Sequence, residues 1–183
     1  MPIMISLLRG VNLGGYHKIK MDDLRALYES LKLRDPQTYA QSGNVVFRTN
    51  ETDQARLSKR IEQGIEKKFG FHSDVILRTD AKLREVIAQN PFARRPGIEP
   101  NKLTVTFFAQ DLRKETCAQI LGIKCNPEEI KLRRHEFYVY FAGGIGGSKL
   151  TPVLDKILKR TGTFRNWNTV TRLLEMTEKL EAE

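Results

Sequence analysis

The alternation of apolar and polar residues over the first 80 positions predicts four strands and two helices. Apolar runs of strand length stand at Ile3–Leu8 and at residues 75–77, and two shorter strands flank the turn at residues 42–44. Between them, apolar side chains recur at helical spacing over residues 22–31 and again over residues 53–69. The predicted order, strand-helix-strand-strand-helix-strand, is that of the ferredoxin-like unit.

Turn and cap residues indicate where these elements begin and end. The two strands around the turn are expected at residues 38–41 and 45–48, with Pro36 ending the connection before them. Thr52 or Asp53 can cap the second helix, and Gly70 stands where a glycine commonly closes one.

The chain beyond residue 80 repeats this plan after a helix and a linker. A helix is predicted from Asp80 to residue 87, and residues 91–101, with three prolines and a glycine, have the composition of a linker. The strands and the short helix that follow are expected at Leu103–Phe108, 113–121, 129–133 and 137–141, in that order.

The C-terminal part is predicted to hold two helices. Thr151 as N-cap and Pro152 at the first helical position start one of them. Residues 161–166 are expected to form a loop, and an amphipathic helix ends the chain. We therefore predict an α+β protein of two ferredoxin-like halves in tandem, residues 1–80 and 102–183, with a helix and linker at 81–101 and an additional C-terminal helix.

Net charge points to a class of partner. The 183 residues hold 31 Lys and Arg against 22 Asp and Glu, a net charge of +9. Residues 1–21 carry three basic side chains and no acid, and residues 143–174 carry six against Asp155 alone. Such a field favours anionic partners, either a small phosphorylated molecule or nucleic acid, although solubility alone is the simpler explanation.

Cysteine spacing and the start of the chain exclude other classes. Cys117 and Cys125 fit neither a zinc site nor a disulfide framework, so we expect free thiols and no metal. The start Met1-Pro2-Ile3 lacks the basic region of a signal peptide, and no apolar run approaches the ~18 residues of a membrane span. A cytoplasmic protein without a membrane partner is expected, with its oligomeric state open.

The glycine-rich loop that follows the first strand is a candidate anion cradle. Glycines let backbone N–H groups approach a ligand, and Gly14 and Gly15 stand here between the basic residues Arg9 and Lys18. The predicted ligand-binding residues of this loop are Arg9, Asn12, Gly14, Gly15 and Lys18. The alternative is a wide turn that needs glycine for its geometry, since the spacing matches no phosphate-binding fingerprint.

Two further segments combine glycines or arginine with a predicted helix start. In the first, Gly146, Gly147 and Lys149 precede a helix whose N-terminal N–H groups can hold an anion. In the second, Arg165 offers a guanidinium fork for phosphate or carboxylate, and Asn168 could orient the ligand. Asn166 is expected to cap the terminal helix and Trp167 to anchor the core.

Catalytic signatures are missing, and no residue pattern names a cofactor. The chain has neither the G-x-S-x-G nor the H-E-x-x-H motif. His17 alone shares a loop with candidate ligand groups and is the one candidate for acid–base work, whereas His72 and His135 are expected to be ordinary surface residues. An RNA-recognition module is disfavoured because its exposed stacking aromatics are absent and Phe47 is expected to face the core.

Five sequence blocks together resemble the bacterial family catalogued as domain of unknown function 1697. They are LLRGVNLGG at residues 7–15, TYAQSGNVVF at 38–47, NPF at 90–92, GGSKLT at 146–151 and RNWNTV at 165–170. The resemblance implies an α+β fold of two ferredoxin-like halves and brings no activity, cofactor or catalytic residue.

The leading hypothesis is that the three polar segments meet in a cleft between the two halves and bind a phosphorylated or otherwise anionic small ligand. The alternatives are an enzyme acting on a phosphorylated substrate, non-specific nucleic-acid binding through the basic surface, and a structural or partner-binding protein. The second of these predicts affinity that falls steeply with salt and ignores base sequence.

Overall fold

A computed structural model of the chain describes residues 1–133, 136–159 and 161–183. Along these residues it contains two four-stranded antiparallel sheets, six α-helices and one short 3-10 helix, a mixed α+β architecture. The chain divides into two compact units, unit 1 with residues 1–84 and 172–183 and unit 2 with residues 85–171. Two helices, α3 (Asp80–Ala88) and α6 (Trp167–Ala182), each contribute residues to both units.

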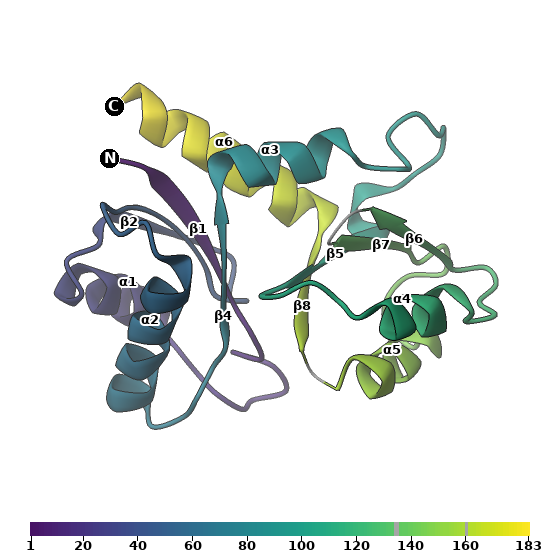
Figure 1. Cartoon of the computed structure of the whole chain (residues 1–183), viewed down its shortest axis with the longest axis horizontal. Helices are drawn as coiled ribbons and strands as arrows, with labels where there is room; N and C mark the ends of the chain where they lie inside the picture. Colours follow the sequence, from purple (N-terminus) through teal and green to yellow (C-terminus); the bar gives the residue numbers. More distant parts are fainter. Residues whose placement is uncertain (134–135, 160) are drawn as a thin grey trace. The chain divides into compact units, whose positions relative to one another are not determined.

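Unit 1 is built on a sheet with the strand order β2-β3-β1-β4. Its elements in chain order are β1 (Ile3–Leu8), α1 (Met21–Ser30), β2 (Arg34–Tyr39), β3 (Asn44–Arg48), α2 (Gln54–Phe69) and β4 (Val75–Thr79). The helices α1 and α2 cover one face of this sheet (Figure 1). Alternate side chains of β1 and β4 face the helices, so the strand periodicity and the helical periodicity of the sequence build one core.

The core of unit 1 contains one buried polar pair. The hydroxyls of Ser6 and Tyr28 lie 2.7 Å apart, and the ring of Tyr28 meets that of Phe47 edge-on at 5.2 Å. Burial raises the pKa of Tyr28, so its hydroxyl stays protonated. Phe47 is fully buried, which confirms the expectation that it faces the core.

Capping in unit 1 follows the sequence signals, while the bounds of β2 do not. Asp53 caps α2 by accepting a hydrogen bond from the Arg56 N–H at 3.0 Å, and Gly70 ends it at a φ of 79°. The prediction that the strand begins at residue 38 was wrong, because β2 starts at Arg34 and includes Pro36. An edge strand tolerates proline, and the pairing with β3 shifts register between Arg34 and Gln37.

Unit 2 repeats the strand order as β6-β7-β5-β8. Its elements are the 3-10 helix η1 (Pro100–Lys102), β5 (Leu103–Phe108), α4 (Lys114–Leu121), β6 (Glu129–Arg133), β7 (Glu136–Tyr140), α5 (Leu150–Leu158) and β8 (Gly162–Asn166). The helices α4 and α5 pack on one face of this sheet (Figure 1). The core between them includes Phe108 and Phe137, whose ring centroids lie 5.6 Å apart.

Three expectations about unit 2 were wrong. Residues 161–166 are not a loop, because β8 pairs with β5 from Thr104 and Asn166 to Phe108 and Gly162. Thr151 is not the N-cap of α5; the helix begins at Leu150, whose N–H donates to the Ser148 hydroxyl at 3.2 Å. Trp167 is half-buried and lies outside the buried core of the described residues.

Other expectations about this part are confirmed. The side chain of Asn166 caps α6 by accepting from the Thr169 N–H at 2.9 Å. Cys117 and Cys125 are both free and half-buried, and burial raises the pKa of the Cys125 thiol.

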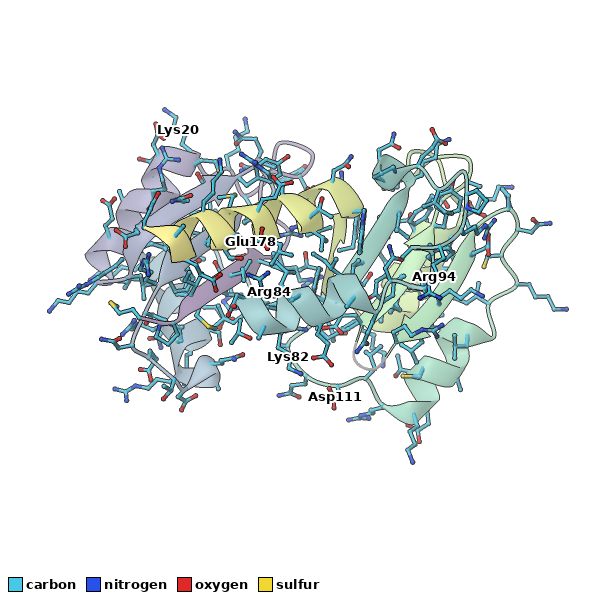
Figure 2. The ribbon with its side chains drawn as sticks, turned by 90° about the horizontal axis from the view of Figure 1, so that it is seen from above. Lys20, Lys82, Arg84, Arg94, Asp111 and Glu178 are labelled. Atoms are coloured by element: carbon cyan, nitrogen blue, oxygen red, sulfur yellow. The ribbon has the colours of Figure 1, made fainter. Side chains whose placement is uncertain are left out.

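Hydrogen bonds and ion pairs hold α3 and α6 within the units. In unit 2, the Tyr138 hydroxyl donates to the carbonyl of Val86 on α3 at 2.6 Å. In unit 1, Arg84 on α3 pairs with Glu178 at 2.7 Å and with Glu181 at 3.1 Å, both on α6. Figure 2 shows Arg84 and Glu178 pointing toward each other. Exposed pairs of this kind contribute little to stability.

Candidate functional site

The tip of the opening loop is a tight turn that places two apolar side chains in solvent. Gly14 and Gly15 adopt φ values of 56° and 83°, and the Tyr16 N–H donates to the Leu13 carbonyl at 3.0 Å. Two successive positive φ values are typical of a type I′ turn, which favours glycine. Leu13 and Tyr16, on either side of the glycines, are 64% and 77% exposed.

Asn12 ties this loop to a second sequence block. Its carboxamide oxygen accepts from the Ile19 N–H at 2.9 Å, and its nitrogen donates to the carbonyls of Ile19 at 3.0 Å and Gln41 at 2.7 Å. A side chain with these three hydrogen bonds closes the loop and links it to the turn between β2 and β3. Asn12, predicted as a ligand contact, therefore has an architectural role.

Gly43 also joins the opening loop to the turn between β2 and β3, through close packing. A Cβ on Gly43 would lie 2.7 Å from Val11 Cγ2 and 2.8 Å from Leu8 Cβ, and its φ is +74°. Its carbonyl also accepts from the Leu8 N–H at 2.9 Å. The blocks at residues 7–15 and 38–47 thus pack against each other through a position that only glycine fits.

A group of charged and titratable side chains lies beside the opening loop, where β1 ends and β4 begins. Asp74 accepts from Arg9 Nη1 at 3.2 Å and lies 2.9 Å from His72 Nε2. The backbone joins the same two segments, because the Arg9 N–H donates to the Asp74 carbonyl at 3.0 Å and the Ser73 hydroxyl to the Arg9 carbonyl at 2.8 Å. This arrangement holds Arg9, His72 and Asp74 at one place on unit 1.

His17 belongs to the same group. Its ring stacks on Phe71 with centroids 4.3 Å apart and planes 7° from parallel. Its Nδ1 lies 3.2 Å from the Gly10 carbonyl, so Nδ1 carries the proton there and Nε2 holds the lone pair of the neutral ring. We name Arg9, His17, Lys18, His72 and Asp74 the opening-loop cluster.

The protonation equilibria of the cluster favour positive charge. The hydrogen bond with Asp74 raises the pKa of His72 above its ordinary value. Burial alone would raise the pKa of Asp74, but hydrogen bonds from His72 and Arg9 outweigh it and lower that pKa. Arg9, Lys18 and a protonated His72 carry positive charge here, opposite Asp74 and the carboxylates of Glu62 and Glu66, which also raise the pKa of His72.

The glycine-rich segment of unit 2 already has a carboxylate beside it. Ser148, which accepts from the Leu150 N–H, also donates to Glu128 Oε1 at 2.9 Å. Lys149 forms no side-chain cap of α5, and Gly146 and Gly147 have open space where a Cβ would stand. The acidic side chain of Glu128 therefore lies close to the helix start that an anion would use.

Arg165 is buried within unit 2. It is 6% exposed, and its Nη1 donates to the Thr163 hydroxyl at 2.7 Å and to the Phe164 carbonyl at 2.8 Å. Burial lowers its pKa to about 10. Since neighbouring residues of a strand face opposite sides, Arg165 lies on the face opposite Phe164 and α5.

The structure thus brings some of the predicted site residues together and separates others. Arg9 and Lys18 lie in unit 1 with His17, and Gly14 and Gly15 form the nearby turn. In unit 2, Arg165 and the start of α5 lie on opposite faces of the sheet, and Asn168 is exposed on the first turn of α6. The opening loop belongs to one unit and the other two segments to the other.

Sequence reasoning missed two members of the cluster. His72 was expected to be an ordinary surface residue, and Asp74 was not considered. The spacing His72-Ser73-Asp74, just before a predicted strand that pairs with β1, is the signal that could have found them. His135, the third histidine, lies outside the described residues.

Among residues 1–133, 136–159 and 161–183, no group of three or more His, Cys, Asp or Glu side chains could hold a metal ion. In the same ranges, every helix is too short or too polar to cross a membrane.

Comparisons with known proteins agree with this fold. A family model described as "Protein of unknown function (DUF1697)" matches residues 1–138. The solved structure of a conserved bacterial protein from Streptococcus pneumoniae matches 96% of this chain and 98% of its own, with a TM-score of 0.77 and 21% sequence identity. At that identity the similarity concerns the fold alone. No curated protein matches the chain.

Proposed function

The chain belongs to the family described as "Protein of unknown function (DUF1697)", and from that premise we propose that it binds a phosphate-bearing small molecule at the opening-loop cluster of unit 1. The observation that carries the proposal is the gathering of four nitrogen-bearing basic side chains at this place. Arg9, His17, Lys18 and His72 lie here with Asp74, to which Arg9 and His72 are both hydrogen-bonded. The carboxylates of Glu62 and Glu66 on α2 also act on His72.

Two features of the loop suit it to an anion. The Nδ1 of His17 is engaged with Gly10, so a protonated ring presents its Nε2–H to a ligand. Gly10, with a φ of 67°, and Gly15 have open space where a Cβ would stand, which leaves room for a ligand to approach the backbone. Arginine, lysine and protonated histidine donate charge-assisted hydrogen bonds, which favour phosphate as their partner.

The proposal needs only unit 1. Asn12 and Arg165 already satisfy backbone and side-chain groups of the protein, and Glu128 lies beside the segment of Gly146, Gly147 and Lys149. An enzyme that acts on a phosphorylated substrate would use the same cluster, with His17 or His72 as its titratable group.

We also infer that each sheet with its two helices is a ferredoxin-like unit, and that residues 81–101 connect the two halves. The order β4-β1-β3-β2, repeated as β8-β5-β7-β6, supports the first inference. The composition of residues 91–101 supports the second.

A second candidate function is favoured by Tyr16. A base of single-stranded nucleic acid could stack on this exposed ring while Lys18 and Lys20 bind phosphates. This would add a stacking surface that sequence reasoning did not find, since it lies in a loop and not on the sheet.

The test compares matched charge changes in the two units. We expect His17→Gln and Lys18→Gln each to weaken binding of pyrophosphate about three- to tenfold in calorimetry at fixed ionic strength. Lys149→Gln, which removes the same charge from unit 2, should leave the affinity unchanged. Equal effects of Lys18→Gln and Lys149→Gln would reject the site.

An oligonucleotide distinguishes the second candidate. Tyr16→Ala should leave pyrophosphate binding intact, and under the nucleic-acid alternative it should weaken binding of a short single strand about tenfold. Unchanged binding of that strand would exclude stacking on Tyr16.

A further inference from the structure

Unit 2 contains a hollow between α5 and the sheet, separate from the cluster of unit 1. Its volume is about 40 Å³. Its lining includes Thr104 and Thr106 on β5, Thr151 and Asp155 on α5, and Phe164 on β8. The rest of the lining is mainly apolar and belongs to the core of this unit.

The matching positions of the two sheets explain why the hollow exists. In sheet 1, β1 pairs with β4 so that Met4, Ser6 and Leu8 stand opposite Thr79, Leu77 and Val75. In sheet 2, β5 pairs with β8 in the same way, with Thr104, Thr106 and Phe108 opposite Asn166, Phe164 and Gly162. The position of Met4 is therefore held by Thr104, and that of Leu77 by Phe164.

These exchanges change how the space under the second helix is filled. Met4 and Leu77 are buried in the core of unit 1. Thr104 is shorter than methionine, and Phe164 remains 48% exposed and does not close over the gap. Phe108 cannot close it either, because its ring lies over Gly162, where a Cβ would come within 2.6 Å of Phe108 Cε1. The gap thus follows from the choice of side chains at a few register positions.

One polar atom of the lining residues lacks a partner. The hydroxyl oxygen of Thr151 is buried and has no hydrogen-bond partner in the part of the chain that the structure describes. A threonine in a helix commonly donates to the carbonyl four residues before it, but Thr151 lies in the first turn, where that residue precedes the helix. Buried hydroxyls are rarely left unpaired, so this hydroxyl can serve a polar atom that enters the hollow.

The single charged side chain of the lining is a carboxylate. Asp155 stands one helical turn after Thr151, on the same face of α5, and is itself exposed. The Asp155 carboxylate favours a cationic head group beside it over an anionic one, although the net charge of the protein is +9.

We propose that this hollow binds the apolar end of a small aliphatic amine. The end of the alkyl chain enters the space over Thr104 and Thr106, and the rest of the chain lies along the exposed ring of Phe164. The ammonium group lies between the Thr151 hydroxyl, which accepts from it, and the Asp155 carboxylate. This ligand class is opposite in charge to the one proposed for unit 1, so the two sites can be tested independently.

The test uses three six-carbon probes that differ only in their head groups, hexylamine, hexanol and hexanoate. We expect hexylamine to shift the amide NMR resonances of Thr151, Asp155 and Phe164 saturably, and hexanoate to bind at least about tenfold more weakly. Asp155→Asn should reduce the affinity for hexylamine to that for hexanol. Equal affinities of the three probes for the unchanged protein would overturn the assignment to an amine.

Two variants separate the hollow from its head-group partners. Thr104→Met restores the side chain that sheet 1 has at this position, so it should abolish binding and raise the thermal midpoint. Thr151→Val keeps the shape, should preserve the fold and should weaken hexylamine binding about fivefold. Val153→Ser, on the exposed face of α5 outside the hollow, is the matched control and should bind as the unchanged protein does. Unaltered binding by folded Thr104→Met, or by Thr151→Val, would overturn the site.

Discussion

For single residues of the glycine-rich blocks, the sequence alone does not distinguish a structural role from a ligand-binding role. A polar side chain in a loop can bond to a ligand or to the chain's own backbone, and both offer the same donors and acceptors. Asn12 bonds to Ile19 and Gln41, whereas Gly14 and Gly15 have positive φ values and no close neighbours other than Tyr16. The structure therefore assigns Asn12 and Gly43 to architecture, and leaves Gly14 and Gly15 at the surface.

Alanine substitutions at Gly43 and Gly15 test whether Gly43 has a packing role that Gly15 lacks. Gly43→Ala should lower the free energy of unfolding by about 2–4 kcal/mol, because its Cβ meets Leu8 and Val11 and its backbone is left-handed. Gly15→Ala shares only the left-handed backbone and should cost about 1–2 kcal/mol. Urea denaturation followed by circular dichroism measures both, and equal losses would contradict the packing role of Gly43.

At the scale of elements, periodicity predicts most of the fold. Strands with continuous apolar runs, β1 and β5, begin and end at the predicted residues, because their side chains are buried on both faces. Helix α2, with its apolar stripe, aspartate cap and closing glycine, has consistent signals at every position. Such agreement between local signals makes an element predictable.

The elements that sequence reasoning missed lie at sheet edges. β8 contains Gly162, Thr163 and the polar pair Arg165-Asn166, so its sequence lacks the alternation of apolar residues that predicts a strand. Its pairing with β5 stabilises the extended conformation instead. β2 was predicted too short because Pro36 is normally a breaker, except on an edge. The opening-loop cluster was found only in part, since strand pairing of β4 with β1 joins residues 9 and 74, which are far apart in sequence.

The pair of His72 and Asp74, just before β4, should make the stability of unit 1 depend on pH. The raised pKa of His72 means that its contribution to stability is present in full below about pH 6.5 and is lost as pH rises through the folded-state pKa. The lowered pKa of Asp74 has the opposite sense, with stability present above about pH 4 and lost as pH falls through the folded-state pKa. The pair therefore stabilises unit 1 most between these limits.

His72→Gln removes the titrating group and keeps a hydrogen-bonding side chain. The thermal midpoint of the variant should fall below that of the unchanged protein at pH 5.5, and the difference should shrink at pH 8.5. A difference that stays constant over this range would show that the ion pair of His72 with Asp74 does not contribute.

At the scale of the whole molecule, the duplicated plan explains how one chain can carry two different sites. Both sheets have the same strand order and two helices on one face, while the side chains at matching register positions differ. In unit 1, Met4 and Leu77 are buried in the core between the sheet and the helices, and the positive groups stand at the loop after β1. In unit 2 the corresponding space is hollow and carries a carboxylate at its mouth.

The net charge of +9 acts on both sites through the solvent. It draws anions toward the surface at low salt, and at about 0.15 M ionic strength its reach falls to roughly 8 Å. Binding that depends on the opening-loop cluster should persist at that salt, since hydrogen bonds from His17 and Arg9 act at contact distance.

A titration with inorganic phosphate at constant ionic strength, followed by NMR of the histidine rings, tests the anion site at the opening-loop cluster. We expect the ring resonances of His17 and His72 to shift together and saturably, and Lys18→Gln to reduce the affinity for phosphate. Rings of His17 and His72 that do not move, or that move equally with chloride at the same ionic strength, would contradict an anion site at the opening loop.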